Sequence, residues 1–511
     1  MLIAGWLSPM RAAAPLTLRS LSSASKATSR FRSTAARFTP TSGRSVITSR
    51  NMGIPNIDWT TESKLGNWRM TQMETDPMRR RFLIAIAFFL MPSFPSAQPS
   101  EDRGETVFVL SDIDMAPTVY ETGELGPPDL DHRDTLSVVT SPAEKSRSIA
   151  MIEVSNSTYG PPGALDISLG GQFAFVAETL RQRPEGATRL DELQQGDTIR
   201  SLRLDGGRSA VVDSVRIGIQ PQAIHLNPAG DLIVAITSDA DRELSFVPVR
   251  EGRFGPVSSF GLDLEPSTGF IPLKATWVQW HPSGRYIAVN LVDRGQVAFY
   301  EVLRAQNGAI SGIRPWGNRV QTNKFPFVGR FSPDGRHYIT SDVQWGIDTV
   351  GFYGVQEGVL TTVRLADVGA TGDAARHTVP HIALGGWGAE TIAFSPDGRF
   401  LVTSNLRGTG KPDGSRDRTE HASLSLYQLD AETGRLIPHG EWPLAGVLPQ
   451  GLAFDRMGQK LFVGVNRYRN DETPLGGAVE IWGITTEGRP ALAPTSDRIR
   501  LPAGVHTIVA R

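Results

Sequence analysis

The sequence predicts an all-β protein, a seven-bladed β-propeller whose C-terminal strand pairs with N-terminal strands to close the ring. Three observations predict this fold. A strand-turn-strand unit repeats six times, the repeats are nearly evenly spaced, and the two ends of the chain carry complementary parts of a seventh unit. With 511 residues, 40% of them hydrophobic, the chain is long enough to bury a large core.

Each repeat consists of an apolar strand, a tight turn that ends in glycine, and a second apolar strand. Such turns combine Pro, which fixes the first φ, Asp or Ser, which bonds to nearby backbone, and Gly, which accepts a positive φ. The turn glycines lie 51 to 63 residues apart, which leaves room for four short strands per blade. These glycines are Gly171, Gly230, Gly284, Gly335, Gly398 and Gly458.

The two ends of the chain predict how the ring closes. The last segment, LPAGVHTIVAR, resembles an innermost strand without its hairpin, whereas TVFVLS, DTLSVVT and SIAMIEV near the start lack an innermost strand. Together they make one composite blade and leave no open sheet edge. We therefore expect one propeller over residues 105–511. The alternative, a β-sandwich or two smaller β domains, does not explain six copies of one hairpin.

The first 97 residues look like targeting material. Residues 78–97 have three arginines, an apolar run and a small-residue stretch ending at Ala97, the layout of a secretory signal peptide. We expect a periplasmic or secreted protein cut near Ala97, with residues 1–77 a non-globular extension from an over-extended start. Residues 1–50 contain no Asp or Glu and resemble a mitochondrial transit peptide, so a mitochondrial location is the alternative.

The export route stays open at this point. Arg79-Arg80-Arg81-Phe82-Leu83 resembles the twin-arginine motif, but the strongly apolar run that follows favours the Sec route. The same run is too short to span a bilayer comfortably, so we expect no membrane span in the mature chain.

Composition and motifs exclude several functions. The formal net charge of −1 gives no surplus of cations for nucleic acid, and the lack of cysteine excludes disulfides, thiolate ligands and a cysteine nucleophile. No P-loop, G-x-S-x-G elbow or C-x-x-C-H haem motif occurs, so we expect no cofactor. We also expect no metal. His377 and His381 flank Pro380 and cannot form a helical ligand pair.

One acidic stretch has some of the carboxylates that a calcium-binding loop needs. Asp129, Asp131 and Asp134 surround His132, but the rest of a calcium-binding loop is missing. We therefore interpret this stretch as a solvated acidic turn.

Long insertions are expected on the face opposite the tight turns. Loops held by a rigid scaffold commonly carry function, so this long-loop face is the predicted binding face. The insertions are 112–133, 179–196, 406–420 and 466–476 between second and third strands, and 314–325 and 367–389 between blades.

Three tryptophans fall in loops assigned to this face. Flat indole rings there suit a sugar ring, a peptide or another apolar ligand, whereas tryptophans in strands suit packing between blades. The predicted ligand-binding residues are Trp316, Trp345, Trp387 and Arg407. The predicted packing residues are Trp277, Trp280 and Trp482.

Two repeats carry a family resemblance: LNPAGDLIVAITSDADRELSFVPV and HPSGRYIAVNLVDRGQVAFYEV. The chain resembles, over most of residues 105–511, the seven-bladed lactonase-like propellers that include 6-phosphogluconolactonase and carboxymuconate cyclase, and the related YVTN repeats. That family shows a D-L-G-x-D-R run, of which Asp241-Arg242 and Asp293-Arg294 match the last two positions. Thr237-Ser238-Asp239 replaces D-L-G in one copy, and Val292 replaces the glycine in the other.

The resemblance implies the fold but does not select an activity, because such propellers host hydrolases, cyclases and binding scaffolds. Lactone hydrolysis needs a base and donors that stabilise an oxyanion. The candidate bases or orienting groups are His225, Asp293 and Glu390, and their candidate partners are Arg242, Arg294 and Arg330. Structural roles stay open for all six, and equally for His506.

We favour an exported binding scaffold that holds a small-molecule ligand or another exported protein on its long-loop face, with the chain as a monomer. The alternative is a hydrolase of a sugar or aromatic lactone.

Overall fold

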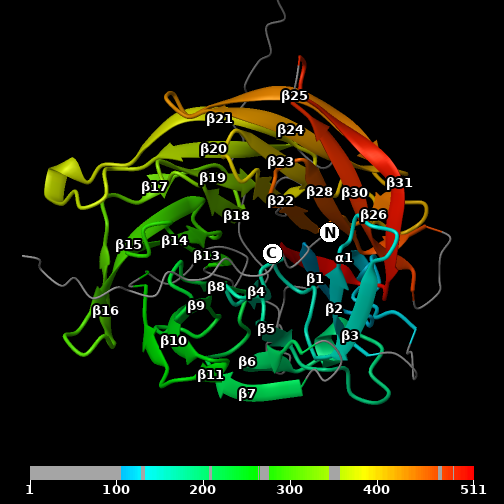
Figure 1. Ribbon diagram of the computed structural model, residues 1–511, viewed down its shortest axis with the longest axis horizontal. Helices are drawn as coiled ribbons and strands as arrows, with labels where there is room; N and C mark the ends of the chain where they lie inside the picture. The colour runs from blue at the N-terminus through cyan, green and yellow to red at the C-terminus, as the bar shows by residue number, and fades with distance from the viewer. Residues whose placement is uncertain are drawn as a thin grey trace, which may run out of the picture. The chain divides into compact units, whose positions relative to one another are not determined.

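Seven sheets of four or five antiparallel strands follow one another around a ring (Figure 1). The computed structural model describes residues 105–127, 133–205, 210–262, 264, 275–344, 357–469, 475–486 and 488–511. The expected extension 1–77 and signal peptide 78–97 lie outside the described residues and stay predictions. The expected all-β fold with seven blades is confirmed.

The first three complete blades run in chain order from the innermost strand outward. Blade 1 is β4 (Leu165–Ile167), β5 (Phe173–Leu180), β6 (Gln195–Arg203) and β7 (Ala210–Arg216). Blade 2 is β8 (Ala223–Leu226), β9 (Leu232–Ile236), β10 (Leu244–Arg250) and β11 (Arg253–Phe254), with β12 (Ser258–Phe260) on β10. Blade 3 is β13 (Trp277–Trp280), β14 (Tyr286–Leu291), β15 (Gln296–Arg304) and β16 (Ile310–Pro315), with β17 (Val320–Gln321) on β15.

The next three blades repeat the same order. Blade 4 is β18 (Pro326–Phe331), β19 (His337–Asp342), β20 (Gly358–Arg364) and β21 (Thr378–Gly386). Blade 5 is β22 (Ala389–Phe394), β23 (Phe400–Asn405), β24 (Ala422–Asp430) and β25 (Arg435–Leu444). Blade 6 is β27 (Gly451–Phe454), β28 (Lys460–Val465), β30 (Gly477–Thr485) and β31 (Ala491–Leu501), and β26 (Gly446–Val447) pairs with β29 (Arg467–Tyr468) beside it.

Blade 7 is composite, as the chain ends predicted. Its order is β32 (Val505–Ala510), β1 (Thr106–Ser111), β2 (Thr135–Thr140) and β3 (Ser148–Glu153). Val109 lies opposite Ile508, and the backbone groups of Thr106 and Arg511 exchange two hydrogen bonds of 2.9 Å. The last strand of the chain therefore supplies the inner strand for the first three.

The repeated turn forms because its side chains satisfy its own backbone. In blade 4, Ser332 Oγ donates to Asp334 Oδ1 across 2.6 Å and accepts the backbone N–H of His337 at 3.0 Å. Gly335 has φ +72°, and the other five turn glycines also have positive φ. Since Gly accepts this conformation without a Cβ clash, the six turns are encoded locally.

Apolar side chains from neighbouring sheets pack against each other and form the core. The largest buried cluster runs through blades 2 to 5 and includes Phe246, Trp280, Val289, Ile339 and Leu401. Trp277, Trp280 and Trp482 are all buried, which confirms them as packing residues. No helix in the described part of the chain has the length and apolar character needed to cross a bilayer.

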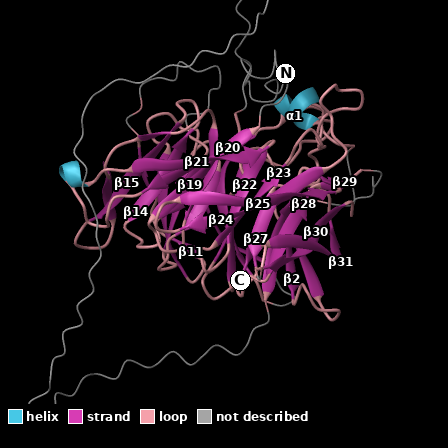
Figure 2. Cartoon of the chain, turned by 90° about the horizontal axis from the view of Figure 1, so that it is seen from above, coloured by secondary structure: helices cyan, strands magenta, loops and turns pink. Residues whose placement is uncertain are grey.

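The tight turns lie at one end of the strands, and the connections between second and third strands lie at the other, where the short helix α1 (Val119–Thr122) projects (Figure 2). This confirms the expected face for the described residues of 112–133, 179–196, 406–420 and 466–476. The expectation for 367–389 was wrong. Residues 378–386 form the outer strand β21, residues 365–377 join β20 to β21 at the tight-turn end, and residues 387–388 alone link the blades.

Candidate functional site

A belt of polar side chains ties the inner strands of the first four blades together. Asp166, His225, Gln279 and Arg330 each stand five residues before the turn glycine of their blade, so they share one level of the ring. The first three each accept a backbone N–H from the next blade. These bonds are Leu226 N to Asp166 Oδ2 at 2.7 Å, Trp280 N to His225 Nδ1 at 3.4 Å and Phe331 N to Gln279 Oε1 at 2.9 Å.

The electrostatics of this belt indicate a structural role. Burial lowers the pKa of His225 to about 4, so its ring is neutral at neutral pH and Nδ1 is free to accept. Burial also lowers the pKa of Arg330 to about 10, which leaves it charged, and its guanidinium carbon lies 4.3 Å from the centre of the Trp277 ring. Two of the predicted catalytic residues thus hold blades 2, 3 and 4 in place.

A second polar level lies nearer the long-loop face. Glu390 and Gln450 each stand eight residues before the turn glycine of blades 5 and 6, three positions above the belt, which is roughly 10 Å along a strand. Gln450 Nε2 donates to Glu390 Oε1 across 3.0 Å. Glu390 is 2% exposed, and its Oε2 has no hydrogen-bond partner among the described residues.

This environment makes Glu390 a group that exchanges protons near neutral pH. Burial is the larger effect and raises the pKa of Glu390 to about 7, while the bond from Gln450 opposes the shift. Both protonation states are therefore populated at neutral pH, as a general acid or base requires.

Tyr120, on α1, reaches this level from blade 7. Its hydroxyl donates to the backbone oxygen of Thr158 across 2.8 Å, and its ring packs against Leu406, Val447 and Leu448. Burial, and next the charge of Glu390, raise the pKa of Tyr120, whereas a hydrogen bond with Gln450 lowers it. The insertion that carries α1 thus reaches from blade 7 toward blades 1, 5 and 6, and Tyr120 lies close enough to Glu390 to respond to its charge. We call Glu390, Gln450 and Tyr120 the mouth cluster.

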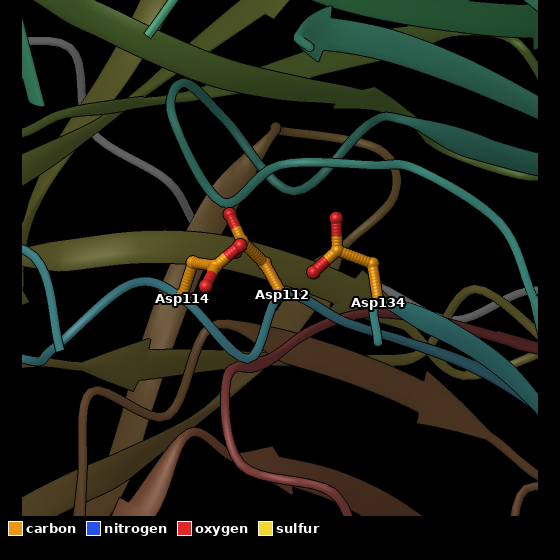
Figure 3. Close-up of side chains that lie close together, drawn as sticks. All are labelled: Asp112, Asp114 and Asp134. Atoms are coloured by element: carbon orange, nitrogen blue, oxygen red, sulfur yellow. The ribbon is translucent and has the colours of Figure 1, made fainter. Parts of the chain in front are cut away.

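Three carboxylates lie where the two ends of the same insertion meet β1 and β2. The side chains of Asp112, Asp114 and Asp134 point toward one another, with ligand atoms within 4.8 Å of one another (Figure 3). Burial, followed by the charge of neighbouring Asp112, raises the pKa of Asp134. Burial also raises the pKa of Asp112 to about 7, although the backbone hydrogen bond from Thr158 opposes this shift.

Oxygen ligands of this kind suit a hard cation, but these carboxylates already have partners. Asp112 accepts the backbone N–H of Thr158 at 2.9 Å, Asp134 accepts that of Ile113 at 3.2 Å, and Arg183 pairs with Asp114 at 3.4 Å. The expected solvated turn was wrong for Asp134, which is buried because it supports the strand ends of blade 7. Asp129, Asp131 and His132 lie outside the described residues.

Two of the predicted ligand-binding residues lie together on the long-loop face. The backbone N–H of Arg407 donates to the oxygen of Trp387 at 3.0 Å, and its guanidinium carbon lies 5.9 Å from the indole ring. Arg407 also pairs with Glu441 at 3.5 Å. Both side chains are partly exposed, so a ligand has access to them.

Trp316 lies in the connection between β16 and β17, as expected, but its side chain is not open to a ligand. The backbone N–H of Trp316 bonds to the oxygen of Phe299, and β17 pairs with β15. The indole is 3% exposed and stacks on Tyr286 with ring centres 3.8 Å apart. We do not retain Trp316 in the site. Trp345 lies outside the described residues and stays a prediction.

Three other predicted catalytic residues, Arg242, Asp293 and Arg294, lie away from the inner strands. Arg242 is exposed between β9 and β10. Asp293 and Arg294 lie in the hairpin between β14 and β15, with Asp293 Oδ1 3.8 Å from Arg294 Nε. His506 lies on β32, the inner strand of blade 7, where its Nε2 is 2.8 Å from Asn156 Oδ1. Burial lowers the pKa of His506 to about 3.

Several residues of the belt and of the mouth cluster were not predicted from the sequence, although their spacing from the turn glycines could have identified them. Counting back from each turn glycine places Asp166 and Gln279 with His225, and Gln450 with Glu390. Tyr120 had no comparable signal, because its segment stands outside the repeat.

These features define the class of the protein, a seven-bladed β-propeller with a buried acid at the mouth of its ring. A family model described as "Lactonase, 7-bladed beta-propeller" matches residues 378–470. No match was found among curated proteins.

Several solved structures share the fold. The periplasmic gluconolactonase of Pseudomonas aeruginosa is 14% identical, with a TM-score of 0.54, over 80% of this chain and 99% of that chain. A candidate 6-phosphogluconolactonase from Bacteroides fragilis is 15% identical, with a TM-score of 0.54, over 81% and 100%. A protein from Lactobacillus plantarum is 13% identical, with a TM-score of 0.52, over 80% and 99%. The resemblance to lactonase-like propellers is confirmed, and at these identities it shows the fold alone.

Proposed function

We propose that this protein is an exported hydrolase of a sugar or aromatic lactone, with Glu390 as its general base. One observation carries the proposal: a buried carboxylate with a pKa of about 7 has one oxygen without a hydrogen-bond partner among the described residues, at the mouth of the ring. The similar fold of a gluconolactonase supports this class of substrate. The sequence alone favours a binding scaffold. We now favour a hydrolase, because Trp316, one of the predicted ligand-binding residues, is buried.

The proposed reaction uses the mouth cluster in three roles. Glu390 Oε2 takes a proton from water, and the water oxygen attacks the carbonyl carbon of the lactone. The ring C–O bond then breaks, the leaving oxygen takes up the proton, and the product is a hydroxy acid. Gln450 holds Oε1 so that Oε2 faces the substrate. The Tyr120 O–H, which donates to Thr158 in the free protein, turns to the developing oxyanion when the substrate binds.

The test is a panel of sugar and aromatic lactones assayed by proton release on the purified protein. We expect turnover that Glu390→Gln lowers by about 100-fold or more, the range for loss of a general base. Glu153→Gln is the matched control, because Glu153 is exposed on β3. A panel without turnover, or a Glu390→Gln variant with parental rates, would exclude this activity.

Partner binding on the long-loop face is the second candidate, favoured by the exposed pair of Trp387 and Arg407. In this reading Trp387→Ala weakens binding of the small ligand or exported protein by about 2 kcal/mol, the effect of removing an aromatic anchor. Glu390→Gln leaves that binding unchanged, which separates the two candidates.

Export to the periplasm or outside the cell is part of the proposal and rests on the signal-like residues 78–97. N-terminal sequencing of the mature protein from its native host is expected to begin just after Ala97. Recovery of residues 1–77 on the stable product, or accumulation in the cytosol, would contradict it.

A further inference from the structure

A second polar site lies on blade 1, among its outer strands. Here β5, β6, β7 and the loop after β5 enclose a groove of about 550 Å³. Three arginines line it, Arg181, Arg200 and Arg216, together with the carboxylates of Glu178 and Asp197. None of these residues belongs to the mouth cluster or to the belt.

The register of the sheet explains how these side chains meet. Thr198 lies opposite Glu178 on β5 and opposite Arg216 on β7, and Arg200 lies opposite Ser214. Directly opposed residues share one face of a sheet, and so do residues two apart on a strand. Glu178, Arg200 and Arg216 therefore rise from the same face of blade 1.

The charges in the groove are unequal. Three guanidinium groups face two carboxylates, an excess of one positive charge. Glu178 is buried and pairs with Arg200 at 3.1 Å. Asp197 Oδ2 is shared, 3.5 Å from Arg181 Nη2 and 3.6 Å from Arg216 Nε, so it makes a close hydrogen bond to neither.

The groove thus has more donors than acceptors. Each guanidinium carries five N–H donors in a flat fork, and Nη1 of Arg200 has no hydrogen-bond partner among the described residues, although it is ion-paired. A phosphate or carboxylate group accepts two parallel bonds from such a fork. The side-chain amides of Gln182 and Gln194, also in the lining, suit the hydroxyl groups of an attached polar body.

We propose that this groove binds a small organic oxyanion, a hydroxylated molecule that carries a phosphate or carboxylate group. Arg181 and Arg216 bind the charged group at the rim, and the pair of Arg200 and Glu178 forms the floor. The lining is too polar for an apolar ligand. The site is independent of the lactone hydrolysis proposed above.

The test is titration calorimetry at low salt with glycerol 3-phosphate and with glycerate, which share a small hydroxylated body and differ in the oxyanion. Whichever of the two compounds binds shows whether the groove prefers a phosphate or a carboxylate group. We expect each of Arg181→Gln and Arg216→Gln to weaken binding about tenfold, because a hydrogen bond to a charged group is lost. Added salt weakens binding as well, since both rim arginines are exposed.

Controls separate this site from folding and from the mouth cluster. The Arg216 side chain is 83% exposed, so its replacement keeps the fold, which a thermal melt checks. Arg304→Gln, an exposed arginine at the end of β15, is expected to leave binding unchanged, and so is Glu390→Gln. The proposal is overturned if neither compound binds at millimolar concentration, or if both bind the Arg181→Gln/Arg216→Gln double variant as tightly as the parent.

Discussion

Gln450 donates its side-chain N–H to Glu390 across 3.0 Å, and this bond joins the inner strands of two neighbouring blades. The acid therefore belongs to the junction between blades 5 and 6. A carboxylate on a single strand keeps its own rotamer freedom, whereas this one has Oε1 fixed by the next blade. The ring itself thus sets the direction of Oε2.

The bond from Gln450 should be visible in the pH profile. It favours the charged form of Glu390, so its removal raises the pKa of that group. As a general base Glu390 must be ionised, and kcat/KM for a lactone is expected to rise with pH through about 7 in the parent. Gln450→Met, of similar size and without the donor, is expected to move this midpoint to higher pH. An unchanged midpoint would show that Gln450 does not position the base.

The buried carboxylates of blade 7 predict a loss of stability with rising pH. The folded-state pKa of Asp112 is raised from 3.8 to about 7, so the folded chain binds the proton more tightly than the unfolded chain. This contribution is fully present below about pH 4 and is lost as the pH rises through about 7. We expect Asp112→Asn to raise the Tm at pH 8 by about 2 °C and to change little at pH 4.5. Asp373→Asn, on an exposed turn, is the control.

His225 is expected to act as a blade tie. His225→Leu leaves the backbone N–H of Trp280 without its acceptor and is expected to lower the free energy of unfolding by about 1–3 kcal/mol in urea. His225→Asn keeps an acceptor near the position of Nδ1 and should cost clearly less.

The pH dependence of this effect has the opposite sign to that of Asp112. The pKa of His225 is lowered from 6.5 to about 4, so its contribution is present above pH 6.5 and is lost as the pH falls toward 4. If His225→Leu and His225→Asn lower the free energy of unfolding equally at all pH values, His225 does not stabilise the contact between blades through its bond to Trp280.

Replacement of Trp316 and of Trp387 compares the stability cost of removing a buried indole with that of removing a partly exposed one. Trp316→Ala removes a buried ring stacked on Tyr286 and is expected to cost about 3–5 kcal/mol of stability. Trp387→Ala removes a partly exposed ring and is expected to cost about 1 kcal/mol. Chemical denaturation measures both. A Trp316→Ala variant as stable as the parent would mean that the ring does not pack the blades.

Removal of β32 tests the closure of the ring. Without Val505 to Arg511, the backbone groups of β1 that pair with β32 are left open in the middle of the core. We expect aggregation in light scattering and a clearly lower Tm, because the exposed strand edge is a template for pairing. Arg511→Ala, which keeps all of β32 and the backbone bonds between Arg511 and Thr106, is the control. A truncated chain that stays monomeric and melts like the parent would contradict the closure.

The fold was predictable because its information is local and repeated. A turn such as the one at Gly335 is determined by its own side chains. Six copies of this turn at nearly even spacing predict a propeller rather than another β fold. The site was less predictable because it depends on contacts between blades. Glu390 was a candidate from its residue type alone, but its raised pKa comes from burial, and its neighbour Tyr120 lies more than 250 residues earlier in the chain.

The errors have a similar physical origin. Trp316 and Trp387 follow strands of the same kind, and only the side chains that cover them distinguish a packed ring from an accessible one. Likewise, residues 367–389 contain turn-forming glycines at both ends, and the pairing of β21 with β20 decides that their middle is a strand.

The composite blade also constrains how the protein is made. β1, β2 and β3 are synthesised before the six other blades, yet their inner partner β32 follows all six in the chain. During synthesis of the six other blades, β1 therefore has no partner strand on its inner edge. The last residues of the chain thus decide when the ring becomes a finished molecule. A translation product that stops before β32 keeps an open strand edge along β1.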